Sequence, residues 1–190
     1  DIYFFANHRV TQIGQVVGLA WTEVGGDLLT IEAVSMSGKG NILRTGTLGD
    51  VMKESARAAW SYARAHAGKL GIEEGAFERD IHIHVPAGAV PKDGPSAGVA
   101  MTVALVSLIT GKPVRNDVAM TGEVTLTGQL LPIGGLKEKS LAAQRAGIKT
   151  VIAPSRNQGD VEEIPAHERA DVKFTYADVV GDALEVALGK

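Results

Sequence analysis

The sequence contains no cysteine among its 190 residues. Disulfide bridges, thiolate metal sites and cysteine nucleophiles are therefore excluded. If the chain carries a covalent nucleophile, we expect that nucleophile to be a hydroxyl. A reducing compartment is compatible with this composition.

A large excess of charge of one sign is also missing. Lysine and arginine together number 19, aspartate and glutamate 22, and the formal net charge is −3. This balance provides no global attraction to the phosphates of a nucleic acid or to an anionic membrane. We therefore expect that the domain requires neither of them as a partner.

Long apolar runs are absent as well. The longest one, residues 97–109, is too short to span a bilayer and contains Thr102 and Ser107, which favours a buried helix. The first residues, DIYFF, lack the basic region of a signal peptide. We therefore expect a soluble, intracellular protein.

No nucleotide-binding loop is present in the sequence. Gly38-Lys39 and Gly111-Lys112 both lack the first glycine of a P-loop and the hydroxyl residue that follows its lysine. We therefore expect no ATPase activity and no cofactor in this chain.

The chain does contain enough apolar residues for one core, since 45% of its residues are hydrophobic and 22% are charged. We expect one domain over residues 13–190, with residues 1–12 as a linker or end segment. Because strands and helices alternate in the second half, the pattern predicts an α/β or α+β fold, with helices packed on a mixed sheet. The expected strands are 13–22, 27–36, 80–85, 117–120, 124–131, 149–153 and 172–175, and the expected helices 48–67, 95–109, 136–146 and 178–188.

Ser96 is the candidate nucleophile. It follows the turn-forming segment 92–95 and opens the apolar run, so we expect it in the first turn of a helix. Unpaired N–H groups and the helix dipole at that place can stabilise the oxyanion that forms when a serine attacks an amide carbonyl. The alternative is a serine that only caps its own helix.

Lys139 is the candidate base. Its neighbours at three and four residues, Gly135, Leu136, Ala142 and Ala143, are small or apolar, so we expect the amine on a buried helix face. Burial lowers the pKa of a lysine, and a neutral amine can take a proton from a hydroxyl. The alternative is a lysine whose stem covers apolar surface while its amine stays in water.

Three segments, in this order, resemble the signature of Lon protease proteolytic domains. They are residues 91–98 (PKDGPSAG), 120–123 (MTGE) and 131–139 (LPIGGLKEK), and residues 18–27 (GLAWTEVGGD) and 46–55 (GTLGDVMKES) extend the match. The resemblance covers roughly residues 13–188. It implies the mixed α/β fold of this family and a serine peptidase with a Ser–Lys dyad, at the positions of Ser96 and Lys139.

The resemblance implies further properties. The threonine at the position of Thr121 bonds the lysine amine, Glu32 lies close to the site, and Asp93, His82 and His84 lie around its rim. Lon-type proteins join the peptidase to an ATPase, absent from this chain, which binds ATP and magnesium. They form rings of six and degrade unfolded or damaged proteins. The implied location is the cytoplasm, with the mitochondrial matrix as the alternative.

Three other interpretations compete with this one. His82 and His84 are two residues apart on an expected strand and could bind a metal, although a third ligand in suitable context is absent. Either histidine could instead serve Ser96 as a base. A non-catalytic Lon-like module of an ATPase is the third alternative, and the presence of both Ser96 and Lys139 argues against it.

Overall fold

A computed structural model of the chain describes residues 13–22, 25–88, 91–169 and 171–189. The segment 1–12, which we predicted to be a linker or end segment, lies outside the described residues.

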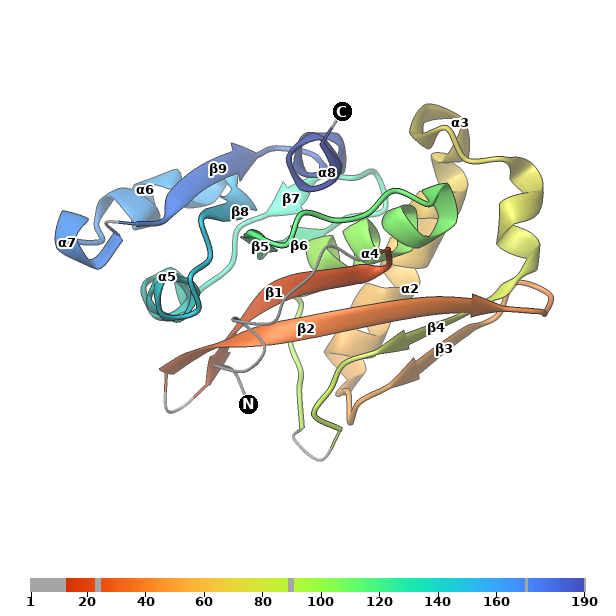
Figure 1. Cartoon of the computed structure of the whole chain (residues 1–190), viewed down its shortest axis with the longest axis horizontal. Coiled ribbons are helices and arrows are strands. Elements are labelled where there is room, and N and C mark those ends of the chain that lie inside the picture. Colours follow the sequence, from red (N-terminus) through yellow and green to blue (C-terminus); the bar gives the residue numbers. More distant parts are fainter. Residues whose placement is uncertain (1–12, 23–24, 89–90, 170, 190) are drawn as a thin grey trace.

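A seven-stranded mixed sheet forms the centre of the fold, with the strand order β3-β4-β2-β1-β5-β8-β9 (Figure 1). β1 pairs antiparallel with β2, and β2 pairs antiparallel with β4. The other neighbours, β3 with β4, β1 with β5, β5 with β8 and β8 with β9, are parallel. The strands are β1 (Gln15–Thr22), β2 (Gly25–Met36), β3 (Ile42–Thr45), β4 (Asp80–His84), β5 (Val118–Met120), β8 (Thr150–Pro154) and β9 (Lys173–Ala177).

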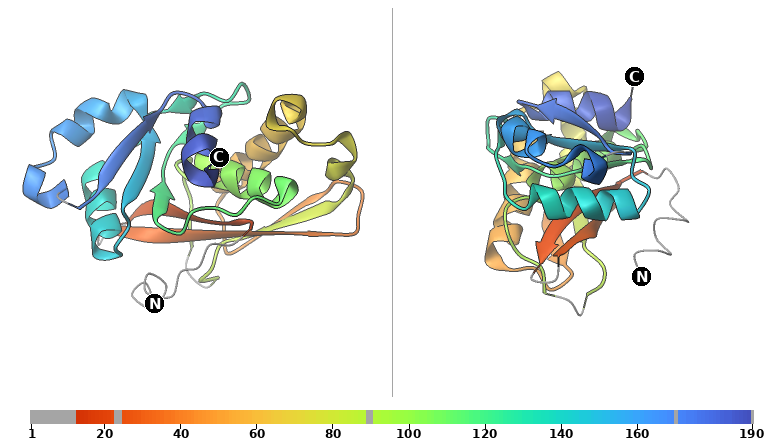
Figure 2. Two further views of the ribbon diagram at one scale, coloured as in Figure 1. Left: turned by 45° about the horizontal axis from the view of Figure 1, so that its top comes forward. Right: turned by 90° about the vertical axis from the view of Figure 1, so that its left-hand side faces the viewer.

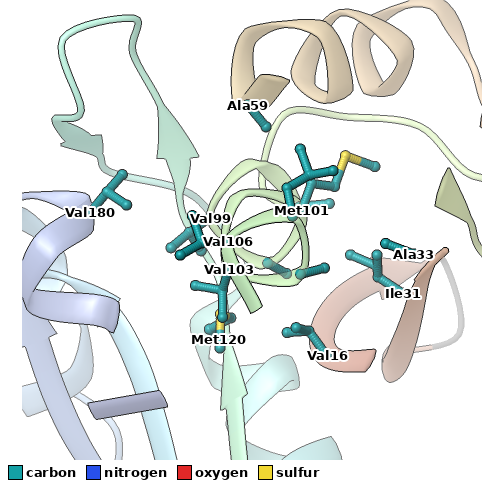
Figure 3. Close-up of a cluster of buried hydrophobic side chains, with 14 of the residues drawn as sticks. Val16, Ile31, Ala33, Ala59, Val99, Met101, Val103, Val106, Met120 and Val180 are labelled. Atoms are coloured by element: carbon teal, nitrogen blue, oxygen red, sulfur yellow. The ribbon is translucent and has the colours of Figure 1, made fainter. Parts of the chain in front are cut away.

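Helices cover both faces of this sheet. On one face α4 (Gly98–Thr110) packs between the sheet, α2 (Asp50–Ala65) and α8 (Val180–Leu188). Figure 3 shows Val103 of α4 near Val16 and Met120 of the strands. On the other face α5 (Leu136–Arg145) lies across the joined ends of β1 and β2 (Figure 2). The predicted mixed α/β fold is confirmed.

The remaining elements are short. They are α3 (Ala67–Leu70), η1 (Glu74–Glu78), β6 (Glu123–Val124), β7 (Leu130–Leu131), η2 (Ser155–Asn157), α6 (Gln158–Glu162) and α7 (Ala166–Arg169). In the part of the chain that the structure describes, no helix has the length and apolarity that crossing a membrane requires.

Two predicted elements differ from the structure. The helix expected to begin at residue 95 begins at Gly98, because the Ser96 carbonyl accepts the Gly122 N–H (2.9 Å) and the helical bonds start at the Ala97 carbonyl. The single strand expected over 124–131 is the hairpin of β6 and β7. Its turn contains Gly128 with a φ of +87°, which a glycine adopts without strain.

Candidate functional site

Two adjoining cavities open at the carboxyl ends of the parallel strands β1 and β5. The first, of about 380 Å³, holds Ser96 and Lys139 in its wall. The second, of about 540 Å³, extends along the start of β2. The two cavities share lining residues and so form one groove, and the shared residues are Ala20, Trp21, Leu29, Met52 and Asp93.

Ser96 lies in the turn before α4, not in the helix itself as we predicted. Its backbone is held against the segment after β5, since its carbonyl accepts the Gly122 N–H and the Gly122 carbonyl accepts the Val99 N–H (3.0 Å). Within the described part of the chain, the N–H groups of Ser96 and Ala97 have no hydrogen-bond partner. These two donors and the start of α4 provide the electrostatics that an oxyanion needs.

Lys139 lies on the buried face of α5, and only 3% of its surface is exposed. Its Nζ donates a hydrogen bond to Thr121 Oγ1 (3.1 Å). Burial lowers the pKa of this amine from its ordinary value of 10.5 to about 8. A substantial fraction of the amine is therefore neutral near pH 8 and able to accept a proton.

Thr121 follows β5 directly and is fully buried. Its N–H donates to the Ile152 carbonyl of β8 (3.0 Å), which fixes its backbone at the end of two parallel strands. The Thr121 hydroxyl therefore gives the Lys139 amine a fixed acceptor.

Asp93 lines both cavities. Its Oδ1 accepts the N–H groups of Gly94 (2.9 Å) and Met52 (3.0 Å), and these backbone bonds, the one from Gly94 first, lower the pKa of the Asp93 carboxyl. The carboxylate thereby ties the loop that leads to Ser96 to the first turn of α2.

Glu32, His82 and His84 lie on the paired strands β2 and β4. Glu32 pairs with His84 across β2 and β4, and His82 Nε2 and His84 Nδ1 both contact Thr45 Oγ1, at 2.7 and 2.6 Å. None of the three lines either cavity. In the described ranges, no group of three histidine, cysteine or carboxylate residues is arranged to hold a metal ion.

Asn157, which no sequence motif marks as a site residue, supports the pocket. Its side chain is 1% exposed; Oδ1 accepts the Ile133 N–H (3.0 Å), and Nδ2 donates to the Ile133 carbonyl and to Asp160 Oδ2 (both 2.8 Å). Ile133 lies in the pocket wall with Ser96. No pattern in the sequence indicates this contact, because its partner is a backbone group 24 residues away.

Comparison with known proteins is consistent with this geometry. The family model of the Lon protease (S16) C-terminal proteolytic domain matches residues 3–190. Over 178 residues the chain is 61% identical to the Lon proteases of Vibrio parahaemolyticus and of Escherichia coli strain K12. Over 188 residues it is 57% identical to Lon protease 1 of Herpetosiphon aurantiacus.

These matches cover 93% of the chain for the first two relatives and 98% for the third. The chain itself spans 23% of the length of each relative. Because the family model extends over almost the whole chain and the relatives agree with it, this chain belongs to the family of Lon protease (S16) C-terminal proteolytic domains.

Proposed function

We propose that this domain hydrolyses peptide bonds with Ser96 as the nucleophile and Lys139 as the general base. Membership of the Lon family makes the chain a peptidase domain, and the proposal concerns the residues that act and the substrates they take. The observation that carries it is a buried lysine of lowered pKa in the same pocket as a serine placed before a helix.

In the first step the neutral Lys139 amine takes the proton of the Ser96 hydroxyl as Ser96 Oγ attacks the substrate carbonyl carbon. The hydrogen bond to Thr121 Oγ1 uses one N–H of the amine and leaves its lone pair available to accept the Ser96 proton. The N–H groups of Ser96 and Ala97 stabilise the oxyanion. The lysine ammonium then gives its proton to the leaving amine, which separates and leaves an ester on Ser96.

In the second step water hydrolyses this ester. Lys139, neutral again, takes a proton from the water as the water oxygen attacks the acyl carbon. Collapse of the intermediate breaks the bond to Ser96 Oγ, and the lysine returns its proton to the serine. The enzyme is restored, and the substrate leaves as a carboxylic acid.

The groove favours an extended, apolar peptide as substrate. β4 pairs with β2 only from Glu32 onward, so, counting described strands alone, the outer edge of residues 25–31 has no strand beside it. Residues 27–30 along this edge line the larger cavity together with Pro86 and Pro91. A peptide can therefore add to the edge as a strand, with its side chains on the apolar floor.

Binding as an added strand requires a substrate chain that is already unfolded. We therefore extend the proposal to the whole protein, which would have to supply unfolded chains to this domain. We propose that it degrades unfolded or damaged proteins delivered by an ATPase part, where ATP and magnesium are bound, and that this domain itself uses no cofactor. We also propose a ring of six chains in the cytoplasm, in keeping with the bacterial relatives.

Cleavage of a fluorogenic peptide tests the roles of the two residues. We expect Ser96→Ala and Lys139→Ala to lose turnover, and Lys139→Arg to be equally inactive because a guanidinium stays protonated. Ser55→Ala, at a half-buried position, and Lys137→Ala, at an exposed one, both lie on helices outside the pocket. They are the matched controls and should cleave at the parental rate. Parental turnover in either Ser96→Ala or Lys139→Ala would refute the proposal.

A further inference from the structure

The start of β2 touches α5 at Gly26, directly beside Lys139. A Cβ placed on Gly26 would lie 2.0 Å from the Glu138 carbonyl oxygen, 2.5 Å from its carbon and 3.0 Å from the Lys139 nitrogen. All three atoms belong to the backbone of α5, so rotation of a side chain cannot relieve the contact. Only glycine allows this approach.

Gly26 contacts α5 at both ends of the helix. Arg145, in the last turn of α5, donates from Nη2 to the Gly26 carbonyl (3.1 Å). Glu138 and Lys139, in the first turn, lie against the Gly26 Cα. The position of β2 is therefore fixed against both ends of the helix that carries the base.

The neighbouring strand of the hairpin adds a second close approach. A Cβ on Gly135, the residue before α5, would lie 2.9 Å from Cβ and Cγ of Trp21 in β1. Trp21 also lines both cavities. The same hairpin thus borders the groove and sets the place where α5 begins.

Gly26 is only partly buried, so its contact adds little to the hydrophobic core. Its effect is geometric, because the Lys139 side chain has to reach Thr121 Oγ1 from the backbone position that this contact defines. A helix pushed outward at Glu138 carries the amine away from Thr121 and from the Ser96 pocket.

We propose that Gly26 is a positioning residue for Lys139: the close backbone approach it allows sets where α5 presents the amine to Ser96. The expected effect of Gly26 on kcat rests on the proposed function. The effect of Gly26 on the position of the Lys139 amine does not, because it can be measured without any substrate.

The test is Gly26→Ala, measured in two ways. Steady-state kinetics on the fluorogenic peptide should show kcat lower by about 100-fold, the order expected for a displacement of about 1 Å, and KM within about twofold of parental. Competitive labelling of lysines with acetic anhydride over a range of pH, read by mass spectrometry, should show the Lys139 pKa rising from about 8 toward 10.5, because the displaced amine gains water.

Gly159→Ala is the matched control. Gly159 lies in α6, has no atom within 4 Å of the added Cβ and does not have the left-handed φ that would strain an alanine. We expect this variant to keep the parental kcat, KM and Lys139 labelling profile, with thermal unfolding near that of the parent.

A folded Gly26→Ala protein with parental kcat and a parental Lys139 pKa would overturn the proposal. If that variant does not fold, Arg145→Ala decides, because it removes only an exposed hydrogen bond between α5 and Gly26. We expect a smaller loss of kcat in Arg145→Ala and a rise of the Lys139 pKa, and parental values of both would overturn the proposal. Ser96→Ala distinguishes failure of the proposed function from failure of the Gly26 proposal. If Ser96→Ala still cleaves the peptide, the proposed function is wrong, but the labelling of Lys139 still measures the effect of Gly26 on the position of the amine.

Discussion

Lys139 and Ser96 differ in how deeply they are buried, and this difference suits their proposed roles. Lys139 is almost completely buried, and Thr121 Oγ1 accepts a hydrogen bond from its amine. Desolvation disfavours the ammonium form of such a lysine and brings its pKa near the pH at which a base must be neutral. Ser96, by comparison, is half-buried and faces the groove.

The pH dependence of kcat/KM follows from this burial. The neutral amine is the active form, so the rate should rise with pH through an apparent pKa of about 8 and level off above it. Steady-state assays from pH 6 to 10 on the parental protein measure this limb. A profile that is flat over this range, or that falls as pH rises, would contradict the assignment of Lys139 as base.

The burial of Lys139 also predicts that this residue lowers the free energy of unfolding at low pH. Below pH 8 the amine is protonated in both the folded and the unfolded chain, so the penalty for burying its charge is fully present; it is lost as pH rises from about 8 to 10.5. At pH 6 we expect Lys139→Met to raise the free energy of unfolding by about 1–3 kcal/mol while abolishing cleavage. Denaturant unfolding at pH 6 and pH 10 checks this, and a gain that is no smaller at pH 10 would contradict the linkage.

For the secondary-structure elements, sequence periodicity predicted most of the helices and strands. It could not predict the contacts between these elements. The apolar run predicted α4, but its first turn depends on Gly122, 26 residues after Ser96. Alternation along 80–85 showed that His82 and His84 share a face of β4. Which elements that face meets depends on the strand order, which alternation along one strand does not show.

Gly26 and Asn157 show the same limit for the site. The expected strands 13–22 and 27–36 left Gly25 and Gly26 in the connection between them, and a sequence does not show that α5 will lie against one of these glycines. Asn157 has a backbone partner, and backbone groups carry no sequence signal. The Lon signature found Ser96 and Lys139 because both lie inside contiguous motifs; the support around them is discontinuous in the chain.

The hydrogen bonds between the Asn157 side chain and the Ile133 backbone join the segment after β8 to the segment before α5. Asn157→Ala leaves the Ile133 N–H and carbonyl without their partner, and we expect the free energy of unfolding to fall by about 1–3 kcal/mol. Chemical denaturation measures this loss. Gln158→Ala is the control: this adjacent, exposed side chain donates to Glu162 Oε1, and its removal should change the free energy of unfolding by less than about 0.5 kcal/mol. Equal effects of the two substitutions would contradict the role of Asn157.

In the whole molecule, the two central groups come from segments on opposite faces of one sheet. Ser96 lies directly before α4 and α5 carries Lys139, and the two residues share a pocket at the carboxyl ends of β1 and β5. Ligand sites of open sheets with parallel strands lie at these carboxyl ends. The sheet and its two helix layers thus bring both residues to one pocket, and the groove along β2 adjoins that pocket.

The most direct measurement is covalent labelling with a serine-directed fluorophosphonate, followed by mass mapping of the modified peptide in the parental protein and in Lys139→Met. If Lys139 activates Ser96, a single label forms on Ser96, faster as pH rises through about 8, and little label forms in the variant. A label on any other residue, or equally fast labelling of Ser96 without Lys139, would contradict these roles of Ser96 and Lys139.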